Sequence, residues 1–288
     1  RGVNMSLKDV ELTGVVTLFY GEICSKLNLI PSKDEIRSKI YNHYKERFEH
    51  ANKDVHHLLS IETINFQGIV NVAYRNYKFD QIVKEVLSQK NCSEIINLGC
   101  GMDTRFFRLD SFDGNYYDVD FKDVIREKKE LIDASDNYHF IETKSIVEKS
   151  FWDEELILSS DEPIIIAEGV FCYIEYHKVV KFVKELFERY PKATLICDVF
   201  LFDEHQCFDD LKSRLVLKFP VKGEKIYHYI SKIPFIKHKK KKAPIDAKKE
   251  LMGINLVNCE NSQNQRVDIS YNNKSYAPQF WIGTYRRD

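Results

Sequence analysis

The chain has 288 residues, of which 43% are hydrophobic and 30% are charged, and its formal net charge is −1. This length and apolar content suit one substantial α/β core, while the near-neutral charge disfavours a general polyanion-binding protein, so we expect no nucleic-acid partner. No apolar run reaches membrane-spanning length and the N-terminus lacks the core of a signal peptide, so we expect no membrane partner.

The cysteines and histidines carry little sign of metal or disulfide chemistry. Seven cysteines are scattered along the chain, and none forms a C-x-x-C pair. An odd, scattered set favours reduced thiols, from which we expect a cytoplasmic protein. No spacing of ligand-type residues predicts a metal site.

Residues 6–90 are predicted to be mostly helical. Apolar side chains follow Phe79 at helical spacing, at Ile82, Val83, Val86 and Leu87. We therefore expect a helical N-terminal cap over residues 1–90, lying over a ligand site that is formed by a core over residues 91–288.

Between residues 94 and 198, strand patterns alternate with helical ones. The clearest helix spans 176–190 and ends at Pro191. Such alternation predicts a doubly wound parallel α/β sheet. The expected strands are 94–98, 115–120, 138–142, 163–168 and 193–198.

The first of these strands leads into Gly99-Cys100-Gly101, which predicts a ligand-binding turn. Two glycines at this spacing let the backbone turn sharply and approach a ligand, and a helix opening next would present free N–H groups. Thr104 occupies the place of the third glycine of a dinucleotide site, and no Gly-Lys-[Ser/Thr] follows. These features favour S-adenosylmethionine, which has no pyrophosphate. The alternative is an ordinary glycine turn between a strand and a helix.

Acidic residues follow two further strands. Asp120, about twenty residues past Gly99, is our first choice for binding ribose hydroxyls, and Asp118 is the second. Asp120 could instead be the N-cap of the next helix. Glu168 and Gly169 follow a wholly apolar strand, which places them at the carboxyl edge of the sheet, where open α/β sheets bind ligands.

Three motifs in order resemble the leucine carboxyl methyltransferase superfamily. They are Asn-Leu-Gly-Cys-Gly-Met-Asp-Thr-Arg at 97–105, Tyr-Asp-Val-Asp-Phe-Lys-Asp-Val at 117–124 with Lys128, and Ala-Glu-Gly-Val-Phe-Cys-Tyr-Ile at 167–174. A fourth, at 73–80, is similar to the family's Arg-x-x-x-x-Asp signature. The superfamily includes eukaryotic enzymes that methylate the C-terminal leucine of a phosphatase, and bacterial polyketide O-methyltransferases of the tetracenomycin type.

The resemblance implies a class I methyltransferase fold, a Rossmann-like sheet closed by an antiparallel C-terminal strand, and a set of cofactor contacts. Arg75 would bind the methionine carboxylate of S-adenosylmethionine, because a guanidinium matches a carboxylate bidentately. Gly99 and Gly101 would form the cofactor turn, Asp120 would bind the ribose, and Glu168 would lie beneath the amino group.

Further positions carry over from the same resemblance. Tyr173 matches a tyrosine near the methyl-transfer pocket and is our candidate catalytic residue. Asp103 and Arg105 are expected to support the geometry of the turn. Where family members carry Asp-Leu against the adenine, this chain has Ser145-Ile146, and a serine can still hydrogen-bond the base, without a charge.

The region from about 200 to 262 is predicted to be a lid insertion that sets acceptor specificity. It is rich in aromatic residues and contains the run Lys239–Lys242, which suggests an anionic partner. Core packing explains the aromatics equally well, and such a lysine run is commonly a solvated loop. Residues 265–271 and 279–285, on either side of Asn272-Asn273, are predicted to pair as a hairpin.

Together these features predict an S-adenosylmethionine-dependent O-methyltransferase that acts on a small-molecule acceptor, a carboxylate or a hydroxyl. A carboxylate is already ionised and needs no general base, whereas a phenol would need one. The alternatives are a protein C-terminal leucine carboxyl methyltransferase, a non-catalytic cofactor-binding or scaffold protein, and a dinucleotide-dependent oxidoreductase. Thr104 disfavours the last of these.

Overall fold

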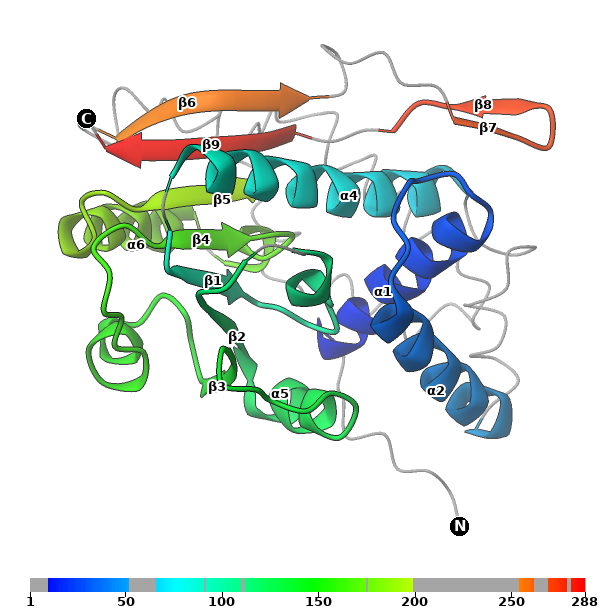
Figure 1. Cartoon of the computed structure of the whole chain (residues 1–288), viewed down its shortest axis with the longest axis horizontal. Coiled ribbons are helices and arrows are strands. Elements are labelled where there is room, and N and C mark those ends of the chain that lie inside the picture. The colour runs from blue at the N-terminus through cyan, green and yellow to red at the C-terminus, as the bar shows by residue number, and fades with distance from the viewer. Residues whose placement is uncertain are drawn as a thin grey trace.

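The computed structural model describes residues 10–51, 66–90, 92–109, 112–174, 176–198, 254–261, 269–278 and 281–287. A seven-stranded sheet with helices on its faces forms its centre (Figure 1). The strands in spatial order are β3 (Tyr138–Thr143), β2 (Asn115–Phe121), β1 (Glu94–Leu98), β4 (Ile164–Ala167), β5 (Thr194–Asp198), β9 (Trp281–Arg287) and β6 (Ile254–Asn261). The helices are α1 (Val10–Lys26), α2 (Glu35–Ala51), α4 (Phe66–Gln89), η1 (Arg105–Arg108), α5 (Lys122–Lys129), η2 (Phe151–Glu155), η3 (Phe171–Tyr173) and α6 (Tyr176–Arg189).

The sheet confirms the predicted doubly wound architecture. Strands β1 to β5 are parallel, and β9 runs antiparallel between β5 and β6. The chain passes from β1 outward to β2 and β3, then crosses back to β4 on the other side of β1. The strand order therefore reverses between β1 and β4, and this is the point at which open α/β sheets leave a crevice for a ligand.

Alternate residues of the central strands pack on opposite faces of the sheet. Ile95, Ile164 and Ile166 belong to the hydrophobic cluster that contains α1, α2 and α4. Ile96 and Ile165 belong to the cluster formed with η2 and α6. Because side chains alternate along a strand, a run of apolar residues buries both faces at once, as the sequence of β4 predicted.

Residues 10–51 and 66–90, the described part of the N-terminal region, are mostly helical, as predicted. Helix α4 crosses one face of the sheet, and α1 and α2 lie at the side towards which the arrowheads of β1 and β4 point (Figure 1). Ile82, Val83 and Val86 of the predicted apolar stripe are buried. Among the residues that the structure describes, no helix is both long enough and apolar enough to cross a membrane.

The predicted C-terminal hairpin is wrong in its pairing. The turn does fall at Asn272-Asn273, whose φ angles of 47° and 59° suit a tight two-residue hairpin turn. Such a turn pairs only the short strands β7 (Ile269–Tyr271) and β8 (Lys274–Tyr276) with each other. The later segment is β9, which instead pairs with β5 and β6. The antiparallel strand that closes the sheet is confirmed, but its partners are distant in sequence.

The predicted lid insertion falls largely outside the described residues. Residues 199–253, which include Lys239–Lys242, lie outside the described residues. The last residues assigned to the insertion, 254–261, form β6 at the edge of the main sheet. These residues pair with β9, so they belong to the main sheet and not to the predicted insertion.

Candidate cofactor-binding site

The turn after β1 is built where the sheet reverses its strand order. Gly99 and Gly101 have φ angles of +60° and +49°, which favour glycine. A Cβ on Gly99 would lie 2.5 Å from Cγ2 of Val170, which follows β4. A Cβ on Gly101 would lie 3.1 Å from the Cα of Gly14 in α1. The two glycines therefore let the turn fit between the loop after β4 and the N-terminal cap.

The prediction that an α-helix opens directly after this turn is wrong. Residues Arg105–Arg108 form a single short 3₁₀ helix, η1, instead of an α-helix. Its two arginines are buried and paired with carboxylates from other elements, and these contacts fix the segment after only one turn. A helix this short offers no substantial dipole, so backbone N–H groups of the turn and nearby side chains are left to recognise a ligand.

The two acids of β2 have different environments, which separates our first and second choices. Asp118 is buried, and its Oδ2 lies 2.7 Å from Nζ of buried Lys128. Asn97 also donates a hydrogen bond of 2.9 Å to the Asp118 carboxylate. Asp118 is therefore committed to contacts inside the protein, and the structure does not favour it as a ligand-binding group.

Asp120 lies at the end of β2, against the glycine turn. Its Oδ2 accepts a hydrogen bond of 2.8 Å from the Gly101 N–H, and its Oδ1 accepts one of 2.7 Å from the N–H of Phe121. The N-cap of α5 is Phe121, so the interpretation of Asp120 as that cap is not supported. Burial raises the pKa of Asp120 to about 6.

Glu168 lies between α4 and the turn. Its Oε1 accepts a 3.1 Å hydrogen bond from Nε of Arg75, and its Oε2 accepts bonds of 3.1 Å from Asn76 and 2.6 Å from Nη2 of Arg105. Arg75 Nε also lies 3.7 Å from Oδ1 of Asp198, at the end of β5. The structure thus brings together Arg75 and Glu168, the two residues expected to bind the amino acid end of the cofactor.

Arg105 and Arg108 join the turn to the N-terminal cap. The Arg105 side chain is fully buried, with Nε 2.7 Å from Oδ1 of Asp80 and Nη1 2.9 Å from Oδ2 of Asp103. Arg108 contacts Asp80 at 2.5 Å and Asp103 at 2.9 Å. The surrounding carboxylates hold the pKa of both guanidinium groups well above the usual range, despite burial. This confirms that Asp103 and Arg105 support the geometry of the turn.

A fourth carboxylate, after those of Asp80, Asp103 and Glu168, extends this network to the start of α2. Asp34 accepts a 2.8 Å hydrogen bond from the backbone N–H of Arg37, as an N-cap side chain does. Its Oδ2 accepts hydrogen bonds from the Thr104 hydroxyl and, at 2.9 Å, from Nη1 of Arg108. The Asp34 carboxylate is therefore the N-cap of α2, and it also connects the N-terminal helices to the glycine turn.

The remaining predicted residues lie around the same edge of the sheet. Ser145 follows β3 and is half-buried, with its N–H donated to Oγ1 of Thr143 at 3.2 Å. The carbonyl of buried Ile146 accepts a 2.8 Å hydrogen bond from Trp152. Tyr173 is half-buried at the end of η3, and its N–H bonds to the carbonyl of Val170 at 3.0 Å. Their roles toward adenine and the methyl group stay predictions.

Four residues of this region were missed in the sequence, namely Asp34, Asn76, Arg108 and Asp198. Asp198 carried a usable signal, because it ends a predicted strand in the same way as Glu168. Asn76 adjoins Arg75, but nothing in its neighbourhood indicated a contact with Glu168. Asp34 and Arg108 are 74 residues apart in the chain, and no local pattern predicts their contact.

These residues fit S-adenosylmethionine. The glycine turn leaves room for close approach, Asp120 can accept hydrogen bonds from ribose hydroxyls, and Arg75 with Glu168 offers opposite charges to an amino acid group. Because S-adenosylmethionine has no pyrophosphate, the site needs no residue to bind one. Within the described ranges, no group of three histidine, cysteine or acidic side chains has a geometry suited to a metal ion.

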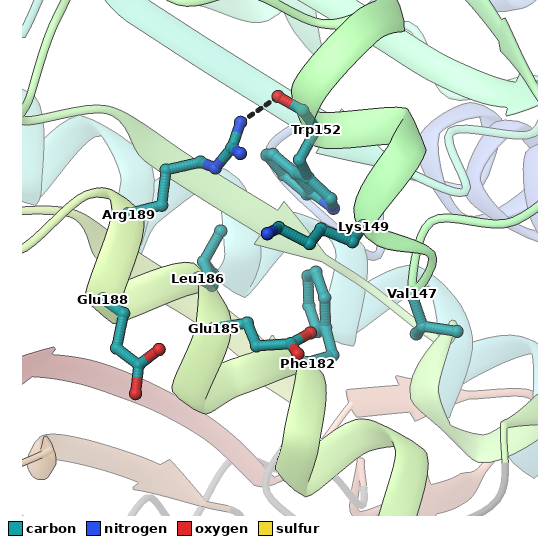
Figure 2. A pocket seen from close by; sticks show the side chains of 8 residues that line it. All are labelled: Val147, Lys149, Trp152, Phe182, Glu185, Leu186, Glu188 and Arg189. Atoms are coloured by element: carbon teal, nitrogen blue, oxygen red, sulfur yellow. Dashed lines mark hydrogen bonds between the residues drawn. The ribbon is translucent and has the colours of Figure 1, made fainter.

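A separate hollow of about 480 Å³ lies beside α6. Figure 2 shows Trp152, Phe182 and Lys149 among the side chains that line this hollow. Arg189 donates a hydrogen bond to the carbonyl of Trp152. The hollow shares no lining residue with the glycine turn, and Arg75, Asp120 and Glu168 do not line it.

Comparison with solved structures supports the fold class. A DUF574 family protein from Streptomyces avermitilis superposes with a TM-score of 0.56, at 11% identity, over 89% of this chain and 98% of that chain. A protein from Thermobifida fusca, provisionally assigned as a methyltransferase, superposes with a TM-score of 0.50, at 14% identity, over 79% of this chain and 85% of that chain. The mostly parallel sheet with its antiparallel C-terminal strand is the fold of a class I methyltransferase.

Sequence comparison then finds a family whose profile matches part of the chain. The profile of the leucine carboxyl methyltransferase family matches residues 46–187, so the chain is related to this family over that stretch. It is also 25% identical over 131 residues to the tetracenomycin polyketide synthesis O-methyltransferase of Streptomyces glaucescens. That match covers 45% of this chain and 47% of the relative, so the chain spans about half the length of this curated relative. The resemblance read from the four motifs is confirmed.

Proposed function

We propose that the protein is an S-adenosylmethionine-dependent O-methyltransferase. The observation that carries this proposal is the convergence of Gly99–Gly101, Asp120, Arg75 and Glu168 at the carboxyl edge of the sheet, where the strand order reverses. The family match over residues 46–187 supports the cofactor assignment. In this proposal the N-terminal helices form a cap, because α1 and α4 contribute residues that contact the turn and Glu168.

We propose a small molecule with a carboxylate or hydroxyl oxygen as the acceptor. The similarity to an O-methyltransferase of polyketide synthesis supports this class. S-adenosylmethionine would supply a methyl group for in-line displacement by the acceptor oxygen. The contribution of this chain would be orientation, since holding reactants in line can supply effective molarities of about 10⁵–10⁸ M. Tyr173, half-buried after the Gly169 turn, is the residue we propose beside the acceptor.

We further propose that the protein acts in the cytoplasm, where thiols stay reduced. Cys24, Cys92, Cys100 and Cys197 are buried and free, which supports this location. The acceptor-specific lid over about 200–253 remains part of the proposal.

Titration calorimetry tests the cofactor assignment. The purified chain should bind S-adenosylmethionine and S-adenosylhomocysteine and should not bind NAD. Asp120→Asn should weaken this binding by about tenfold or more, because a charge-assisted contact with the ribose is lost. Asp123→Asn is the matched control, because Asp123 lies three residues away and pairs only at the surface with Arg126. Absence of binding at millimolar cofactor would overturn the proposed function.

A further inference from the structure

Asp198 and Glu168 lie at equivalent positions at the ends of two adjacent strands. Strands β4 and β5 are parallel, and their last paired residues are Ala167 and Cys197. Glu168 and Asp198 are the next residue of each strand, so both carboxylates lie at the carboxyl edge. Arg75 Nε lies 3.1 Å from Oε1 of Glu168 and 3.7 Å from Oδ1 of Asp198. One guanidinium group therefore lies between two carboxylates.

The turn after β4 holds Asp198 in place. One Asp198 oxygen, Oδ2, accepts a hydrogen bond from the N–H of Gly169. Gly169 has a φ of +67°, and a Cβ on it would lie 3.1 Å from Nη2 of Arg75. The backbone thus comes close to Arg75 only because this residue is glycine, and the same turn fixes the direction of the Asp198 carboxylate.

The carboxylates of Glu168 and Asp198 differ in the contacts that their oxygens make. Both oxygens of Glu168 accept hydrogen bonds, from Arg75, Asn76 and Arg105. Oδ1 of Asp198 is too far from Arg75 Nε for a normal hydrogen bond. Asp198 is also the most accessible of the three side chains, at 31% exposed, against 24% for Arg75 and 12% for Glu168.

The charge around Arg75 favours a cation next to Asp198. Burial and the neighbouring Glu168 raise the pKa of Asp198, and Arg75 opposes them. A further positive group near Oδ1 would relieve both the repulsion and the loss of hydration. An amino acid zwitterion brings such a group, together with a carboxylate for the guanidinium.

We propose that Asp198 binds the α-ammonium group of the cofactor together with Glu168, while Arg75 binds the cofactor carboxylate. This inference rests on the proposed function and assigns a specificity-determining contact within that site. Asp198 would select cofactors and products that keep the free amino group.

Three thioether ligands separate this role from a structural one. S-adenosylhomocysteine has both charged groups, its decarboxylated analogue keeps only the amine, and its deaminated analogue keeps only the carboxylate. Asp198→Asn should weaken binding of the first two by about tenfold or more, because each loses a charge-assisted contact, and should change binding of the deaminated analogue less than about twofold. Arg75→Ala should weaken binding of S-adenosylhomocysteine more than binding of the decarboxylated analogue.

Two further variants keep the test interpretable. Asp198→Ser retains an oxygen that can accept the Gly169 N–H while removing the charge, so it should show the same ligand pattern as Asp198→Asn even if the latter folds poorly. Asp123→Asn, on the surface beside Arg126, should bind all three ligands as the wild type does.

The outcomes separate this inference from the proposed function. If the wild type binds none of the three ligands, the proposed function fails. If the wild type binds S-adenosylhomocysteine, and the Asp198 variants weaken all three ligands equally or none of them, the ammonium contact is wrong and the proposed function stands.

Discussion

The carboxyl edge of the sheet and the hollow beside α6 use charged side chains in opposite ways. At the edge, Arg105 and Arg108 are 0% and 6% exposed, and each lies against two or more carboxylates. At the hollow, Lys149 and Glu188 are exposed, and the lining also includes the buried Trp152 (Figure 2). The more deeply buried charges are therefore at the edge.

This difference distinguishes the predicted site from the hollow by the burial of its charges. Removing a charge from water is costly unless the charge is paired and hydrogen-bonded, so a buried ionic network is tolerated only where its geometry is well satisfied. Exposed charges cost little and constrain little. The arginine network connects α2, α4 and η1 to the glycine turn, whereas Lys149 and Glu188 at the hollow are exposed.

The largest effect should come from removing a buried arginine. Arg105→Ala leaves the carboxylates of Asp80, Asp103 and Glu168 short of a partner and should reduce the free energy of unfolding by about 3–5 kcal/mol. Urea denaturation measures this loss. Arg126→Ala, which breaks an exposed pair with Asp123, is the control and should cost less than about 1 kcal/mol. Equal losses for the two variants would contradict the comparison.

A smaller effect should follow from separating the cap from the turn. The Thr104 hydroxyl donates to Asp34 and accepts from Nη1 of Arg108 at 2.9 Å. Thr104→Val keeps the shape but leaves these groups partly unsatisfied, at a cost of about 1–3 kcal/mol. We also expect weaker binding of S-adenosylhomocysteine by calorimetry, because the turn loses a support.

Ser38→Ala provides the control for Thr104→Val. Ser38 donates a 2.7 Å hydrogen bond to Glu22, within the cap and away from the turn. This variant should lose stability without losing cofactor affinity. If both variants weaken cofactor binding to the same extent, a general loss of stability in the N-terminal helices explains the effect. The Asp34–Thr104 contact then has no special role in binding.

The pH dependence of cofactor binding should report Asp120. Its folded pKa of about 6 lies above the ordinary aspartate value, so the protonated form is favoured at pH 5. Ribose hydroxyls donate to the ionised form, and affinity should therefore rise by about tenfold between pH 5 and pH 7, as the ionised fraction increases. Calorimetry across this range measures the change. Asp120→Asn should bind with a flat profile, and a wild-type profile equally flat would exclude Asp120 as the ribose acid.

The smallest effect on stability should come from substitutions at the hollow beside α6. Glu188→Gln and Lys149→Gln remove exposed charges and should change the free energy of unfolding by less than about 0.5 kcal/mol, with no change in cofactor affinity. Thermal melting and calorimetry on the two variants check this expectation. A clear loss of cofactor binding in either variant would show that the hollow and the carboxyl edge are coupled.

The sequence alone was enough to predict the sheet and the glycine turn. β1 starts and ends where its pattern predicted, the other core strands do so to within one residue, and α6 ends just before Pro191. These features are set by local rules, since apolar alternation, glycine and proline act over a few residues. The strand pattern likewise placed Glu168 and Asp120 at one edge, because the ends of parallel strands meet there, and the family resemblance added Arg75 from α4.

Tertiary structure decided the partners of the charged groups. Asp118 and Asp120 are two residues apart in one strand, yet only packing shows that Lys128 holds the first and Gly101 the second. Asp34 reaches Arg108 across 74 residues of chain. Sequence periodicity tells which face a side chain takes but carries no record of what lies opposite, and the free energy of a buried charge depends on that neighbour.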